Sequence, residues 1–190
     1  ATEAYRYVLH LNAQRCRAGM PPYSSMARDL IKMGKAAEID PADVCKDVLE
    51  SIEGTRGIRT APLGFYQGMA KHLSGESLKR LFATCPSSVS GDEWAGAADK
   101  AGLFKLLTEA EMLEWLCDAI RSSNRYSAEN LVQVVEKYKE ILHGHVLRVA
   151  CSNLHLSLLI SLEKAGVIWE FTDPVGTGNR QFFSYLRGKY

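Results

Sequence analysis

Start signals for helices recur along this chain, and they constrain its fold more than any other feature of the sequence. The clearest is Asp40-Pro41: the aspartate can accept a hydrogen bond from the first amides of a helix, and proline fits the first helical position because no N–H is needed there. Ser90 with Glu93, and Thr108 with Glu111, have the spacing of capping boxes. The sequence therefore predicts many short helices.

Glycine, proline and short polar loops separate the expected helices. We expect helices over residues 3–18, 24–38, 41–54, from 62, over 76–84, from 90, from 108 and over 127–142, with shorter helical pieces at 145–151 and 153–165. The glycine-containing segment 55–61 is expected to be a connector. Helices at this spacing can stack as antiparallel pairs, although no internal repeat is evident.

Apolar residues at helical spacing predict the buried side of each helix. They are Tyr7, Val8, Leu11 and Cys16 in the first segment; Met26, Leu30, Met33 and Ala37 in the second; Val44, Val48, Leu49 and Ile52 in the third; and Phe65, Tyr66, Met69 and Leu73 in the fourth. Gly64 and Gly68 lie four residues apart on the fourth helix, so we expect a neighbouring backbone to approach it closely.

The composition is that of an ordinary globular protein with a real core. The 190 residues include 23 Lys and Arg against 22 Asp and Glu, a formal net charge of +1, and 46% are hydrophobic. This balance excludes a disordered chain, a collagen-like chain and a strongly basic nucleic-acid coat. No apolar run approaches the roughly 20 residues of a membrane-spanning helix, and the first residues lack the pattern of a signal peptide, so we expect no membrane span.

The spacing of the cysteines argues against zinc and against a disulfide framework. The five are Cys16, Cys45, Cys85, Cys117 and Cys151. None is near enough in sequence to another to form a C-x-x-C pair. We expect them to be small buried apolar residues in a reducing compartment, and hence an intracellular protein.

The pattern changes period near the C-terminus. Residues 167–171 and 180–186 are rich in strand formers, and 172–179 are dense in turn residues, which predicts one β-hairpin. We therefore expect a mainly α fold: a multi-helix bundle or stacked helical hairpins, with a C-terminal winged-helix-like unit that ends in the hairpin. The expected domains are a helical domain over 1–122 and the winged-helix-like unit over 127–190, packed on it.

The order of helices and hairpin in 127–190 resembles winged-helix domains, and PCI-type subunits of large complexes share this outline at the level of pattern. In many winged-helix domains the helix before the hairpin enters the DNA major groove and the wing contacts phosphate. The resemblance implies these roles for the helix 153–165 and the wing 172–180. Candidate residues for binding nucleic acid or a protein partner are Asn153, His155, Thr177, Asn179, Arg180, Phe183 and Arg187.

Charge decides between the two kinds of partner. Nucleic-acid affinity depends on many cations, yet the helix 153–165 carries only Lys164, and the wing carries Arg180 beside Asp173. We therefore expect a non-catalytic helical interaction module, a subunit or domain of a larger assembly that docks a protein partner through the C-terminal unit. The alternative is a winged-helix protein that binds DNA or RNA.

Three sequence patterns resemble parts of enzymatic or metal sites. His143 and His145 would point to different sides of a helix, so a metal site shared with His155 is disfavoured. Cys151 and His155 have i,i+4 spacing, but no oxyanion site accompanies them. The glycine-rich 176–179 lacks the lysine of a P-loop. We expect no catalytic residue, no metal and no small-molecule cofactor.

Overall fold

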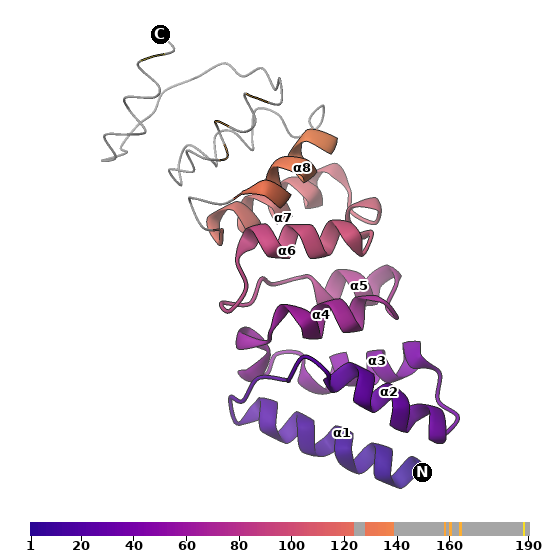
Figure 1. Ribbon diagram of the computed structural model, residues 1–190. Helices are drawn as coiled ribbons and strands as arrows, with labels where there is room; N and C mark the ends of the chain where they lie inside the picture. Colours follow the sequence, from indigo (N-terminus) through magenta and orange to yellow (C-terminus); the bar gives the residue numbers. More distant parts are fainter. Residues whose placement is uncertain (124–127, 139–157, 159, 161–163, 165–187, 189–190) are drawn as a thin grey trace. The chain divides into compact units, whose positions relative to one another are not determined.

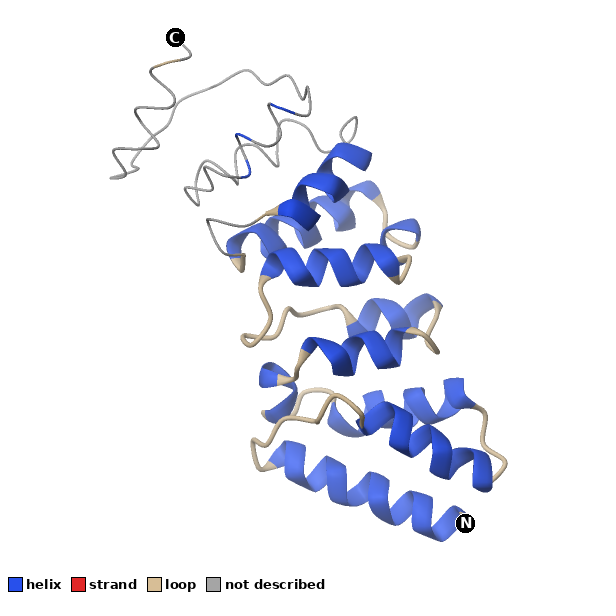
Figure 2. Ribbon diagram, in the orientation of Figure 1, coloured by secondary structure: helices blue, strands red, loops and turns tan. Residues whose placement is uncertain are grey.

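The fold of the protein is described by a computed structural model for residues 1–123 and 128–138 and for Leu158, Ile160, Lys164 and Gly188. This part of the chain is mainly helical, as the sequence predicts, and contains no strand (Figures 1 and 2). The α-helices are α1 (Thr2–Arg17), α2 (Met26–Ala36), α3 (Pro41–Ile52), α4 (Leu63–Ala70), α5 (Gly75–Leu81), α6 (Gly91–Lys100), α7 (Glu109–Arg121) and α8 (Glu129–Lys137); two short 3₁₀ helices are η1 (Gly57–Thr60) and η2 (Leu103–Lys105).

The chain divides into two units. The first comprises Ala1–Val89 and Ala97–Leu106, and the second comprises Ser90–Gly96 and Leu107–Tyr190. In the first unit, α1, α2 and α3 pack against one another, α4 packs against α2, and α5 packs against α4 (Figure 1). Helix α2 thus contacts α1, α3 and α4.

Helix α3 forms as its cap and stripe predict. Asp40 Oδ1 accepts a hydrogen bond from the Ala42 N–H at 2.8 Å, and Pro41 is the first helical residue. The four apolar residues predicted to face the core from α3 are all buried. The four predicted for α4 and the residues just after it are also buried: Phe65, Tyr66, Met69 and Leu73. In α2, Met26 and Leu30 are buried, whereas Met33 is half-buried.

The predicted buried side of α1 is wrong. Cys16 is buried as expected, but Tyr7 is 64% exposed and Leu11 is 39% exposed. Tyr5 is buried in their place, and its hydroxyl donates to Asp47 Oδ2 of α3 at 2.9 Å. Because aromatic and aliphatic residues occur on several sides of this helix, contact with α3 decides which side faces the core.

Of the two glycines predicted to allow a close approach, Gly64 has a tight neighbour and Gly68 has only an ordinary contact. A Cβ atom added at Gly64 would lie 3.0 Å from Ser24 Cβ, and one added at Gly68 would lie 3.8 Å from Ala27 Cβ. The absence of a side chain on Gly64 lets Ser24, which precedes α2, lie close to α4.

The segment 55–61 is more structured than a connector. It contains η1, and Tyr66 in α4 donates its hydroxyl hydrogen to the Ile58 carbonyl at 3.1 Å. On its other side, the Ser87 N–H donates to the Arg59 carbonyl at 2.8 Å, and the Ser88 hydroxyl donates to the Ala61 carbonyl at 2.7 Å. Residues distant in sequence therefore satisfy its backbone acceptors.

In the second unit, the start of α6 contacts the end of α7. The Gly91 N–H donates to the Ser122 carbonyl at 3.0 Å, and any side chain at Gly91 would overlap the carbonyl of Ala119. A glycine is thus required at this position by the backbone of α7.

The same part of α6 also caps α8. Asp92, only 6% exposed, accepts hydrogen bonds from the Leu131 N–H at 2.9 Å and from Asn130 Nδ2 at 3.1 Å. Ala128, at the N-cap position of α8, makes no side-chain cap of its own. The carboxylate of one helix therefore supplies the cap of another.

The two predicted capping boxes differ in outcome. The box at Thr108 is complete: the Glu111 N–H donates to Thr108 Oγ1 at 3.2 Å, and the Thr108 N–H donates to Glu111 Oε2 at 2.8 Å. At the start of α6 the serine half is present, with the Glu93 N–H donating to Ser90 Oγ at 3.2 Å.

The C-terminal predictions fall largely outside the described residues. Helix α8 ends at Lys137, short of the predicted end near 142. In the range 153–165, Leu158, Ile160 and Lys164 are helical; Leu158 is buried and Lys164 is exposed. The hairpin, the winged-helix-like unit and its boundaries at 127–190 stay predictions.

Candidate functional site

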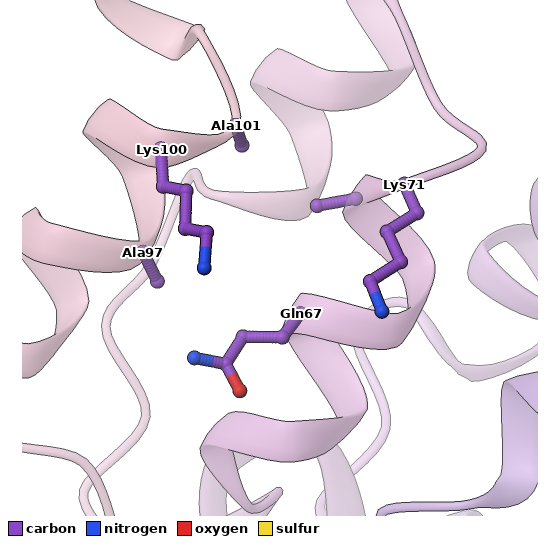
Figure 3. Close-up of a pocket in the computed structure, with 6 residues that line it drawn as sticks. Gln67, Lys71, Ala97, Lys100 and Ala101 are labelled. Carbon is purple, nitrogen blue, oxygen red and sulfur yellow. The ribbon is translucent and has the colours of Figure 1, made fainter.

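A pocket of about 350 Å³ lies between α4 and the end of α6, within the first unit (Figure 3). Its lining residues are Gln67, Ala70, Lys71, Ala97, Lys100 and Ala101. Figure 3 shows the side chains of Gln67, Lys71 and Lys100 reaching into the opening. The pocket thus brings polar groups from two helices together.

Helical spacing places these side chains. Gln67 and Lys71 are four residues apart, so they lie on the same side of α4 and its C-terminal end. Ala97 in α6 and Ala101, which follows its last residue Lys100, have the same spacing. The alanines form the walls, and their short side chains leave the space between the helices open.

The pocket has a positive electrostatic character. Two ammonium groups and no carboxylate belong to its lining residues. In the described part of the chain, neither Lys71 nor Lys100 forms an ion pair; Lys46 and Arg121, by contrast, pair with the nearby Asp43 and Asp118. The Gln67 amide adds a neutral donor and acceptor. The arrangement is suited to an anion.

A second hollow, of about 580 Å³, lies along α1 and α3. Its lining residues include Tyr5, Arg6, Asp47 and Glu50. Tyr5 and Asp47 already bond to each other, and desolvation by burial, followed by the bond to Asp47, raises the pKa of the Tyr5 hydroxyl. This hydroxyl therefore stays protonated and structural.

A surface on α1, here called the α1 face, combines apolar and basic side chains. Tyr7 and Leu11 are one helical turn apart and exposed, so they lie on the same side of α1. Arg15 follows Leu11 by one more turn on this side, and Arg17 lies on the other flank of the pair, by the periodicity of the helix. Arg6 instead lines the hollow along α1 and α3, and Glu3 lies one turn before Tyr7. All three arginines are exposed, and none forms an ion pair within the described residues.

The thiols are structural in this environment. Cys16, Cys45 and Cys117 are buried and Cys85 is half-buried, and all four are unpaired. Burial raises the pKa of the Cys45 and Cys85 thiols to about 11, so they are protonated near neutral pH. Among the described residues, no three His, Cys, Asp or Glu side chains are grouped to hold a metal ion.

The binding residues predicted from sequence all lie outside the described residues. They are Asn153, His155, Thr177, Asn179, Arg180, Phe183 and Arg187. The sequence predicts neither the pocket between α4 and α6 nor the α1 face. Lys71 and Lys100 come from different parts of the sequence, and no short motif contains both. The helical spacing of Tyr7 and Leu11 predicts buried residues, whereas both are exposed.

The described residues define a mainly helical protein, and the comparisons add no closer identity. No protein-family model matches the chain, no curated protein matches it, and no solved structure matches it. Within the described ranges, none of the helices combines the length and the apolar character needed to cross a membrane.

Proposed function

We propose that the protein is a non-catalytic helical interaction module, a subunit or domain of a larger assembly. The observation that carries this proposal is the α1 face. A tyrosine that is 64% exposed and a leucine that is 39% exposed lie together on a helix whose other side is packed on α2 and α3. Tyrosine and arginine are enriched among residues that anchor protein interfaces.

The charges near the α1 face favour an acidic partner. Arg15 and Arg17 flank the exposed pair toward the C-terminal end of α1, and Glu3, the one acidic residue of this helix, lies toward its N-terminal end. An amphipathic helix with acidic residues beside its apolar stripe would cover the two apolar side chains and pair with the arginines. The partner we propose is therefore an acidic amphipathic helical segment of another subunit.

We further propose that the C-terminal unit docks a partner. Residues 127–190 would dock a protein partner through the seven residues predicted from sequence, while nucleic acid is the alternative partner for the helix 153–165 and the wing 172–180. The shortage of cations in that region supports a protein partner.

Site-specific photocrosslinking tests the α1 face. A photoreactive amino acid replaces Tyr7 in the full chain, which is expressed in the cells that make it, and crosslinked products are sized. We expect a discrete adduct whose partner contributes an acidic helix, and we expect Leu11→Asp to abolish it. Thr84→Asp, which adds the same charge at another exposed residue, is the matched control.

The alternatives give different results. The proposal is wrong if position 7 yields no adduct, or if Thr84→Asp removes the adduct as completely as Leu11→Asp does. Salt-sensitive binding of duplex DNA or single-stranded RNA, lost in Arg180→Ala and Arg187→Ala, would instead assign the C-terminal unit to nucleic acid.

A further inference from the structure

We propose that the pocket between α4 and α6 binds a small molecule that carries a phosphate group. This inference goes beyond the interaction function and does not depend on the α1 face, because the two surfaces share no residue. The pocket volume of about 350 Å³ falls within the range of small-molecule sites, about 300–1,000 Å³.

Two positive charges converge on the pocket. Lys71 and Lys100 come from different helices, and their ammonium groups enter the same opening (Figure 3). The lining holds no carboxylate, and in the described residues neither lysine has an ion-pair partner. Like charges that face a shared cavity repel each other. A bound anion would turn this repulsion into two attractive interactions.

Helix ends explain these lysines only in part. Lys100 ends α6, and Lys71 follows the last residue of α4, where each cation stabilises the partial negative charge of the helix C-terminus. That partial charge is about half an elementary charge per helix, so two full ammonium charges leave the pocket positive overall. Helix stabilisation also requires neither that the lysines converge nor that the walls be alanine.

The hydrogen-bond donors of the pocket match the acceptor oxygens of a phosphate group. A phosphate monoester carries about −1.5 to −2 charges near neutral pH and has three strong acceptor oxygens. Lys71 and Lys100 supply two charged donors, and the Gln67 amide supplies a neutral donor. A carboxylate has one charge and two oxygens, so it would use fewer of these groups.

Three alanines lie between and beside these donors in the lining of the pocket. Ala70, Ala97 and Ala101 present methyl groups to the pocket, which leaves room beside the phosphate for the organic part of the ligand. An extended nucleic-acid strand would instead need a continuous track of cations. The lining therefore favours a compact phosphorylated molecule.

The test uses the full chain and two probes, glycerol 3-phosphate and inorganic phosphate, at constant ionic strength. Backbone NMR signals of Gln67, Lys71 and Lys100 should shift saturably with both probes, and not with chloride. Lys71→Met and Lys100→Met should each weaken binding by at least about fivefold. Lys32→Met, at an exposed lysine of α2, is the control and should change nothing.

A larger side chain in the pocket lining distinguishes binding of a phosphorylated organic molecule from binding of free phosphate. Ala101→Leu should weaken binding of glycerol 3-phosphate and leave inorganic phosphate unaffected. The proposal is overturned if neither probe binds saturably, if Lys32→Met weakens binding as much as the pocket variants do, or if Ala101→Leu has no effect on glycerol 3-phosphate. Tighter, salt-dependent binding of duplex DNA through the same two lysines would also overturn it.

Discussion

The carboxylate of Asp92 accepts a hydrogen bond from the backbone N–H of Leu131 at 2.9 Å, which joins the first turn of α6 to the first turn of α8. Leu131 N–H is one of the amides that a helix start leaves without a partner inside the helix. Asp92 also accepts a hydrogen bond from the side-chain amide of Asn130. Gly96 leaves space for that amide, since a Cβ atom added at Gly96 would lie 2.8 Å from Asn130 Cγ. One buried carboxylate therefore links α6 to α8 in the second unit.

Removing this carboxylate should loosen α8. We expect Asp92→Ala to lower the free energy of unfolding by about 2 kcal/mol, because a buried N–H loses its acceptor and the cap is lost. Hydrogen exchange should accelerate first at the Leu131 amide. Glu93→Ala, at the exposed neighbour, is the control and should cost within about 0.5 kcal/mol; equal effects of both variants would contradict the role of Asp92.

Two glycine-to-alanine substitutions should have opposite effects. Gly91→Ala places a methyl group onto the Ala119 carbonyl and should destabilise the protein by about 2 kcal/mol or more. Gly68→Ala meets Ala27 Cβ at an ordinary 3.8 Å and should stabilise α4 by up to about 1 kcal/mol. Thermal unfolding of the two variants measures both effects, and destabilisation by Gly68→Ala would show that the α2–α4 contact is tighter than described.

Tyr5→Phe removes the hydrogen bond between α1 and α3. The expected cost is about 1 kcal/mol, since Asp47 keeps access to water. Tyr7→Phe removes a hydroxyl from the same helix at a residue that is 64% exposed, and should leave stability unchanged. Urea titration of the two variants measures the difference, which should vanish if Tyr5 contributes only through its ring.

Alkaline pH should weaken the fold through Cys45. Burial raises the pKa of this thiol from 9.0 to about 11, so the unfolded chain loses the proton at lower pH than the folded chain does. The stability contributed by the neutral thiol is complete below pH 9 and is lost as the pH rises through about 11. The free energy of unfolding should therefore fall less steeply above pH 9 in Cys45→Ala than in the natural chain, and parallel profiles would refute this assignment.

Local signals predicted the helices well where the local residues decide the structure. The Asp40 cap, the stripe of α3 and the Thr108 box all act within a few residues, and each forms as predicted. The buried side of α1 failed because apolar residues occur around much of that helix, and Tyr5 is selected by Asp47, 42 residues away. The spacing of Ser90 and Glu93 gave no sign that the intervening Asp92 caps a helix 39 residues further on.

The candidate sites were harder to predict for the same reason. Lys71 and Lys100 become neighbours of one pocket only through the packing of the first unit, and no short motif contains both. Tyr7 and Leu11 look like core residues until the opposite side of α1 is seen to be buried. The seven C-terminal residues predicted from the winged-helix resemblance stay predictions, with the crosslinking and titration experiments as their test.

The bonds around η1 have a consequence for proteolysis. Arg56 and Arg59 are exposed and sit in a glycine-containing sequence, the kind of place where trypsin usually cuts. A protease must draw several residues into an extended conformation, and here the carbonyls of Ile58, Arg59 and Ala61 are held by Tyr66, Ser87 and Ser88. Cleavage at this linker-like segment must therefore wait for local unfolding that breaks those three bonds.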